Sequence, residues 1–410
     1  MPYERKIIND PVFGFINIPK GLLYDIVRHP LLQRLTRIKQ VGLSSVVYPG
    51  AQHTRFQHSL GAFHLMSEAI TQLASKGNFI FDSEAEAVQA AILLHDIGHG
   101  PFSHVLEDTI VKGVSHEEIS LMLMERMNKE MNGQLSLAIQ IFKDEYPKRF
   151  LHQLVSGQLD MDRLDYLRRD SFYTGVTEGN IGSARIIKML DVADDRLVIE
   201  SKGIYSIENF LTARRLMYWQ VYLHKTSVAY EKMLISTLLR AKELASQGVE
   251  LFASPALRFF LYNDINPTEF YNNPDCLENF IQLDDNDIWT ALKVWSTHTD
   301  KVLSTLSTGM INRNIFKVEI SSEPISEDRK KELTLHISQQ LGITLSEANY
   351  FVSTPSIEKN MYDPADDSID IIYKDGTIKN IAEASDMLNI SLLSKKVKNC
   401  LLYTSPSPRD

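Results

Sequence analysis

The chain has 410 residues, of which 44% are hydrophobic and 23% charged, a balance typical of globular domains that excludes a disordered or collagen-like chain. The formal net charge of -9 argues against a broad nucleic-acid-binding surface. No apolar run approaches the roughly 18 residues of a membrane-spanning helix, and the opening MPYERKIIND lacks an apolar signal region, so we expect a cytoplasmic protein with neither nucleic acid nor membrane as its partner.

The predicted elements are mainly helical up to residue 312. Apolar residues recur at helical spacing in DIVRHPLLQRLTRIKQ (25–40) and in EAEAVQAAILLHD (84–96), and helices are expected to continue to about residue 247. A short strand-like piece, RLVIE (196–200), interrupts them. Further helices are expected beyond residue 250, with three prolines as breaks: Pro255, Pro267 and Pro274.

The pattern changes after residue 313. The runs FKVEI and YFVST indicate strands, a helix is expected over 326–341, and Asp375-Gly376 is expected to join two strands as a hairpin. The last ten residues, LLYTSPSPRD, end in a Ser/Pro pattern and are expected to be a disordered or non-native tail. The predicted division is an HD core, a helical extension, a small α+β domain and this tail: 1–250, 251–312, 313–400 and 401–410.

Histidines are concentrated in one part of the chain. Eight of the twelve lie within the first 116 residues, where an even scatter would place about 3.4. Three of them stand with an aspartate in HDIGHGPFSH (95–104), directly after an apolar helix. A buried carboxylate is costly unless it is paired or binds a cation, so a metal ion accounts for His95 and Asp96 at this position. The HD pair alone could be a capped, hydrogen-bonded histidine, but core packing gives no reason for the whole string.

Four blocks resemble the HD-domain phosphohydrolases, specifically the branch of deoxynucleoside triphosphate triphosphohydrolases that includes the SAM- and HD-domain dNTPases. They are, in chain order, PGAQHTRFQHSLGAFHL (49–65), LLHDIGHGPFSH (93–104), SHEEIS (115–120) and DMDRLDYLRRD (160–170). Their order and spacing fit that branch, and the resemblance covers roughly residues 5–240. The fold class it implies is mainly α, an HD-domain helical core to which a small C-terminal α+β appendage is joined.

The resemblance implies four ligands to one divalent metal ion: His58, His95, Asp96 and Asp162. Two imidazoles and two carboxylates leave positions for water and phosphate oxygens and suit manganese, iron, magnesium, nickel or zinc, so the identity of the metal stays open. The two cysteines lack CxxC spacing and predict no thiolate site. By itself Asp162 could be a surface carboxylate, since acids and bases alternate around it. Asp165 and Arg169, four residues apart, are expected to pair and to support a ligand.

The candidates for catalysis come from the second and third blocks. The resemblance assigns His104 to protonation of the leaving 5′-oxygen, and His99 and His116 to the phosphates. If a helix follows Pro101, Glu107 can hold one ring nitrogen of His104. His116 also follows Ser115 in an S-x-x-E pattern typical of a capping box, and both roles could hold together.

Seven positions are candidate substrate contacts: Gln40, Arg55, Tyr166, Asp170, Arg214, Tyr222 and Lys225. The resemblance places Gln40, Tyr166 and Asp170 at the sugar, with the tyrosine filling the space that a 2′-hydroxyl needs. It places triphosphate and base contacts in the helical stretches that hold Arg214, Tyr222, His224 and Lys225. An acidic protein must gather cations locally to bind a triphosphate, and the chain has no GxxxxGK[ST] loop for that purpose.

These features predict metal-dependent hydrolysis of deoxynucleoside triphosphates (dNTPs) to deoxynucleoside and tripolyphosphate. Two alternatives stay open: a phosphohydrolase for nucleoside monophosphates or cyclic nucleotides, and a nucleotide sensor with little turnover. The resemblance also implies a homo-oligomer, dimer or tetramer, and a nucleotide activator. Where the guanine-activated type has acidic and basic base-reading residues, this chain has Arg28 and Thr36, so guanine activation is not expected.

Overall fold

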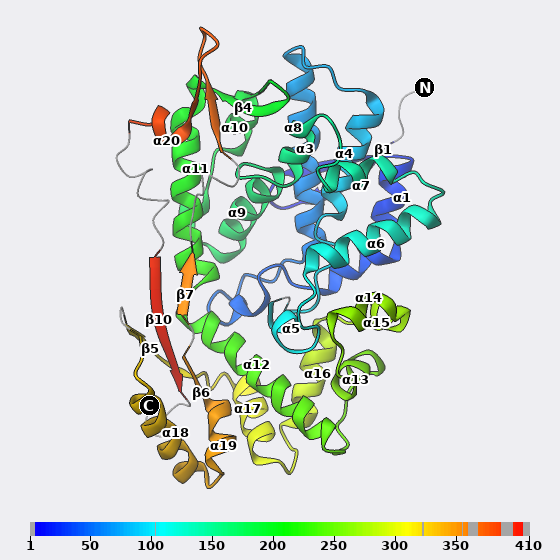
Figure 1. Cartoon of the computed structure of the whole chain (residues 1–410). Helices are drawn as coiled ribbons and strands as arrows, with labels where there is room; N and C mark the ends of the chain where they lie inside the picture. Colours follow the sequence, from blue (N-terminus) through cyan, green and yellow to red (C-terminus); the bar gives the residue numbers. More distant parts are fainter. Residues whose placement is uncertain are drawn as a thin grey trace.

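The computed structural model describes residues 5–102, 104–321, 324–354, 356–359, 368–386 and 397–404. Its architecture is mainly α with small sheets, as the sequence predicts (Figure 1). The helices of the HD core are α1 Leu22–Arg28, α2 Pro30–Gln33, α3 Arg55–Ser75, α4 Asp82–Leu94, α5 His104–Thr109, α6 His116–Glu130, α7 Ser136–Phe142, α8 Arg149–Val155, α9 Met161–Thr174, α10 Ser183–Met189, α11 Ile204–Met217 and α12 Lys225–Ser246.

The later helices are α13 Pro255–Tyr262, α14 Pro267–Asn272, α15 Pro274–Phe280, α16 Asp285–Trp295, α17 Lys301–Asn312, α18 Glu327–Leu341, α19 Leu345–Ala348 and α20 Ile381–Ala384. Short tight or wide turns of helix are η1 Arg34–Arg37, η2 Gly42–Val46, η3 Thr177–Gly179, η4 Ser201–Gly203, η5 Tyr218–Tyr222 and η6 Asn349–Phe351. In the described part of the chain no helix is both long and apolar enough to span a membrane.

The strands are β1 Arg5–Asp10, β2 Gly14–Pro19, β3 Leu190–Ala193, β4 Arg196–Glu200, β5 Lys317–Ser321, β6 Val352–Ser353, β7 Ser356–Lys359, β8 Asp370–Ile372, β9 Ile378–Asn380 and β10 Val397–Thr404. β1 and β2 form an antiparallel hairpin in a part of the chain for which a mainly helical structure was expected. Ile16 and Ile18 anchor it in the core. Asp10 accepts hydrogen bonds from the backbone of its turn and pairs with Arg169 of α9 at 2.7 Å, so the hairpin also supports the helix that carries the fourth sequence block.

The helix α3 lies at the centre of the core, with α4 and α9 packed against it. Thr54 and Gln57 form a capping box that begins α3. Ala87, Ala90 and Ala91 of α4 are buried among the apolar side chains of this core, as their spacing predicts. Gly61 of α3 faces α9: a Cβ at this position would lie 1.9 Å from Asp165 Oδ1 and 2.1 Å from Arg169 Nη2. The absence of a side chain therefore allows the two helices to approach closely.

The helical extension follows the sequence prediction with one refinement. Pro255, Pro267 and Pro274 each occupy the first turn of a helix, where a proline loses no hydrogen bond, so they begin helices as well as break the preceding ones. α12 contacts both α5 of the core and α17 of the extension and can be followed between them in Figure 1.

The C-terminal part contains the predicted strands and hairpin. β8 and β9 pair antiparallel across the Asp375-Gly376 turn, and α18 covers the predicted helical range. β8 also pairs in parallel with β4 of the HD core, so backbone hydrogen bonds cross the predicted boundary at residue 313, and the division into domains remains a prediction.

Residues 401–404, the first four of the segment expected to be a disordered or non-native tail, are in a strand, so the expectation of disorder does not hold for them. The expectation of a non-native end stays a prediction. These residues form the end of β10, which pairs with β5 and β6, and Leu402 and Tyr403 are fully buried. Pairing with distant strands and burial of two large side chains stabilise a segment whose local sequence lacks periodicity. Residues 405–410 lie outside the described residues.

Candidate active site

Three helices bring one group of metal-ligating side chains together. His58 lies in the first turn of α3, His95 directly follows α4, and Asp162 lies in the first turn of α9. Their ligand atoms all lie within 4.8 Å of one another. His58 Nε2 is 3.4 Å from His95 Nε2, and Asp162 Oδ1 is 3.0 Å and 3.4 Å from these two nitrogens.

The Nδ1 atom of each of these two histidines is hydrogen-bonded to a residue that lies outside the group. His58 Nδ1 donates to Asp165 Oδ2 at 2.6 Å, and His95 Nδ1 donates to the carbonyl oxygen of Ile92 at 2.7 Å. With both Nδ1 atoms engaged in this way, both Nε2 atoms point into the centre with their lone pairs available. Two imidazole nitrogens and a carboxylate oxygen converging in a buried space fit a divalent cation.

Asp165 and Arg169 form the predicted pair on α9. Arg169 Nε donates to Asp165 Oδ2 at 2.9 Å, and both side chains are fully buried. The same carboxylate oxygen accepts from His58, while Arg169 reaches Asp10. The pair therefore orients the ligand His58.

Asp96 borders the centre from a different direction. Its Oδ1 lies 3.4 Å from His95 Nε2 and 3.3 Å from His99 Nε2. Its Oδ2 accepts from Arg55 Nη1 at 2.7 Å and lies 3.8 Å from His58 Nε2. The structure thus brings all four predicted ligands together, with Asp96 shared between the centre and the Arg55 guanidinium.

The electrostatics of the centre favour a cation. Burial opposes charge on His58, but its hydrogen bonds with Asp162 and Asp165 outweigh burial and raise its pKa to about 10. Burial would raise the pKa of Asp162, but the hydrogen bonds with His58 and His95 hold it well below its ordinary value. Positive charge between these carboxylates is therefore stabilised, whether protons or a metal ion carry it.

Comparisons with known proteins agree with this geometry. The sequence model of the HD domain family matches residues 55–169, and that of the HD associated region matches residues 181–253. The crystal structure of a phosphohydrolase from Bacteroides thetaiotaomicron is 94% identical in sequence and has a TM-score of 0.96, covering 98% of this chain and 100% of that chain. The chain belongs to the HD-domain phosphohydrolases.

More distant relatives of this HD-domain phosphohydrolase cover different shares of it. The Bacillus subtilis protein YwfO is 29% identical over 98% of this chain and 92% of its own length. The deoxynucleoside triphosphate triphosphohydrolase SAMHD1 homolog of Dictyostelium discoideum is 30% identical over 77% of this chain. This chain covers 60% of the length of the Dictyostelium protein.

A second histidine cluster lies beside the candidate metal centre formed by His58, His95 and Asp162. His99 and His116 stack with ring centroids 3.9 Å apart, and Glu107 Oε1 lies 3.1 Å from His116 Nδ1. Burial and the nearby Arg55 lower the pKa of His99 to about 3. The capping box at His116 is present, with Ser115 and Glu118 hydrogen-bonded to each other's backbone, so this residue begins α6 and faces the cluster as well.

His104 begins α5, but its side chain lies outside the described residues. Its assignment as the acid, and its pairing with Glu107, therefore stay predictions. Glu107 Oε1 also lies 3.1 Å from Nδ1 of His116.

Two of the predicted sugar contacts, Tyr166 and Asp170, follow Asp162 on α9 at intervals of four residues. Asp170 is buried, and its Oδ2 accepts from the Tyr222 hydroxyl at 2.7 Å. The rings of Tyr166 and Tyr222 meet edge to face with centroids 5.9 Å apart. Gln40 has a buried side-chain oxygen with no hydrogen-bond partner among the described residues.

The candidate cations occupy three places. Arg55 is buried beside Asp96, while Lys225 is exposed at the start of α12, where His224 is the N-cap. Arg214 is buried, and its Nη1 donates to the neutral Gln158 Oε1 at 3.0 Å. Because this partner carries no charge, the positive charge of Arg214 is not neutralised by that contact.

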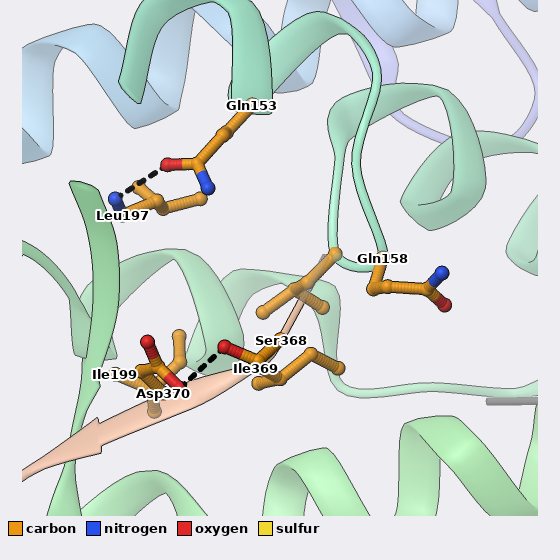
Figure 2. Close-up of a pocket in the computed structure, with 8 residues that line it drawn as sticks. Gln153, Gln158, Leu197, Ile199, Ser368, Ile369 and Asp370 are labelled. Atoms are coloured by element: carbon orange, nitrogen blue, oxygen red, sulfur yellow. Dashed lines mark hydrogen bonds between the residues drawn. The ribbon is translucent and has the colours of Figure 1, made fainter. Parts of the chain in front are cut away.

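Gln158 also lines a small cavity between the HD core and β8, shown in Figure 2. In that view Gln153 accepts from the backbone of Leu197 and Ser368 donates to Asp370. The cavity measures about 20 Å³, which is room for one water molecule, so it is too small for a substrate.

Several residues that support the site were not among the sequence candidates. Arg34 donates to the carbonyl oxygens of Ile97 and His99 from a fully buried position, and Ser120 Oγ bridges the carbonyl of His95 and the N–H of Gly98. No short-range pattern marks Arg34 or Ser120, because both act on a turn more than 20 residues away. His53 lies inside the first block and contacts Asp170, 117 positions away.

Proposed function

We propose that this phosphohydrolase cleaves deoxynucleoside triphosphates to deoxynucleoside and tripolyphosphate. The observation that carries the proposal is the arrangement along α9. Tyr166 lies one turn beyond the ligand Asp162, and Asp170 lies one turn further, in contact with Tyr222. One turn rises about 5.4 Å, so a phosphate at the metal centre would place an attached sugar beside Tyr166 and Asp170.

Charge and similarity add support. Arg55, Arg214 and Lys225 are cations in an otherwise acidic chain, and a triphosphate needs several of them. Three anionic phosphate groups, in place of one, distinguish this substrate from a nucleoside monophosphate. The similarity to the Dictyostelium deoxynucleoside triphosphate triphosphohydrolase points to the same substrate class.

The proposed reaction is attack of water on the α-phosphorus. The oxygen of water forms the new bond to phosphorus, the bond from phosphorus to the 5′-oxygen breaks, and the 5′-oxygen takes up a proton. A divalent cation held by His58, His95, Asp96 and Asp162 would supply Lewis acidity and a water of lowered pKa. Arg55 and the His99–His116 pair would stabilise charge on the phosphates, and His104 would give the proton to the leaving oxygen.

The experiment is a product analysis. Chelator-stripped protein is incubated with each dNTP, singly and mixed, with manganese, iron(II) or magnesium added back, and the products are separated by chromatography. Deoxynucleoside plus tripolyphosphate, abolished by Asp96→Ala and reduced by His104→Ala, supports the proposal. Intact dNTPs in every mixture would refute it and favour a monophosphate or cyclic nucleotide substrate, or a sensor.

The homo-oligomer and the nucleotide activator are part of the same proposal. A dimer or tetramer is expected from the resemblance, and mixing dNTPs in the assay reveals an activator as hydrolysis that no single dNTP gives. Light scattering with and without nucleotide measures the oligomer directly.

A further inference from the structure

His53 holds one oxygen of the Asp170 carboxylate. Its side chain is fully buried, and its Nε2 donates to Asp170 Oδ1 at 2.6 Å. The other oxygen of Asp170 accepts from the Tyr222 hydroxyl at 2.7 Å. Two donors from different parts of the chain thus fix both oxygens of one buried carboxylate, which is more than an ion pair for stability requires.

The ring of His53 is held in one orientation. It stacks on Tyr173 with centroids 4.4 Å apart and an interplanar angle of 16°. Because a carboxylate only accepts, the proton of a neutral ring lies on Nε2. Nδ1 is buried and has no hydrogen-bond partner among the described residues. The hydrogen-bonding capacity of the ring within the described residues is therefore directed at Asp170 through Nε2.

Gln40 supplies a second acceptor, and its backbone is hydrogen-bonded to His53. The backbone N–H of Gln40 donates to the carbonyl oxygen of His53 at 3.0 Å. The side-chain Oε1 of Gln40 is buried and has no partner among the described residues. Each oxygen of Asp170 also retains a lone pair beyond the one used by His53 or Tyr222. Acceptors with available lone pairs require a hydrogen-bond donor as their ligand, and they repel phosphate.

We propose that His53 is a positioning residue that orients Asp170 to accept a hydrogen bond from a sugar hydroxyl of the substrate. This inference deepens the proposed function and rests on it. His53 acts through Asp170 and makes selection for a hydroxyl-bearing sugar depend on a residue that does not touch the metal centre. The first consequence is that loss of the His53 donor weakens discrimination between substrates with and without that hydroxyl.

The test compares each dNTP with its 2′,3′-dideoxy counterpart, which lacks the 3′-hydroxyl. His53→Phe keeps a ring against Tyr173 but removes the donor, and His53→Gln keeps an amide donor near the position of Nε2. His64→Gln is the matched control, because His64 lies in the same sequence block (49–65) and is partly exposed beside Glu68. Metal-loaded full-length proteins are used throughout, and thermal melting confirms that each variant folds.

We expect wild type to prefer the dNTP, and His53→Phe to lose at least about 10-fold in kcat/KM on the dNTP, mainly through KM, with little change on the dideoxy substrate. His53→Gln should restore part of the preference. Should His53→Phe not fold, His53→Leu removes the same donor and gives the same comparison. Equal losses on both substrates would refute the role of His53 alone. A wild-type enzyme that hydrolyses neither substrate would refute the proposed function and this inference with it.

Discussion

Gly98 lies in the turn that follows His95 and Asp96, where this turn packs against the start of α6. Its replacement by alanine tests whether activity requires this close packing. A Cβ at this position would lie 2.2 Å from the carbonyl oxygen of His116 and 2.3 Å from the backbone nitrogen of Ser120. Both are backbone atoms, so no side-chain rotation relieves the contact. To reach the 3.0 Å that real Cβ atoms keep, the start of α6 must retreat by about 0.8 Å.

This displacement acts on His116 and, through Ser120, on the turn that follows His95 and Asp96, whereas the other two candidate ligands stay in place. His116 stacks on His99 at 3.9 Å, whereas His58 and Asp162 come from α3 and α9. A misplacement of about 1 Å can cost roughly 100-fold in rate. We therefore expect Gly98→Ala to reduce kcat about 10- to 100-fold while metal stoichiometry stays at the wild-type level.

The variant should still fold, because overpacking costs about 1–3 kcal/mol against a typical stability of about 5–15 kcal/mol. The assay is steady-state phosphohydrolase kinetics together with metal analysis by mass spectrometry. Gly182→Ala is the control, since a Cβ there meets only Arg185 Cβ at 3.9 Å. Wild-type kcat in Gly98→Ala would refute the reasoning, as would an equal loss in the control.

Three further predictions concern the metal and one buried acid. Asp165→Asn removes the carboxylate that accepts a hydrogen bond from His58 Nδ1. It should weaken metal affinity about 10- to 100-fold in a metal titration. The control is Asp144→Asn, at an exposed ion pair with Arg149, which should leave metal affinity unchanged. Chelation should abolish hydrolysis and lower the melting temperature, and readdition of metal at 100 times its Kd should return about 2.7 kcal/mol; a melting temperature unaffected by chelator would contradict a resident metal. Burial raises the pKa of Asp285 from 3.8 to about 6, so its favourable contribution is present below its unfolded pKa and is lost as the pH rises through this window. Asp285→Asn should therefore be more stable than wild type at pH 7, by at most about 3 kcal/mol, with the difference vanishing near pH 3.5 in urea unfolding; a difference independent of pH would disprove the shift.

The sequence indicated the candidate metal centre because the blocks that carry the family resemblance are short strings of neighbouring residues. His95 and Asp96 are neighbours in the chain, and Asp165 and Arg169 stand at the four-residue spacing that places them on one helical face. The mainly helical fold and the β8–β9 hairpin follow likewise from periodicity and turn residues. Such features depend only on residues that are close together in the chain, so they can be recognised in the sequence without the tertiary structure.

The remaining features depend on residues that meet only when the chain folds. His53 and Asp170 are separated by 117 positions, and Asp10 and Arg169 by 159. The strand β10 has no local pattern of its own and exists because β5, β6 and β7 offer it hydrogen bonds and a buried place for Tyr403. Long-range contacts leave no spacing to detect, because the free energy that selects them comes from packing and burial in the tertiary structure.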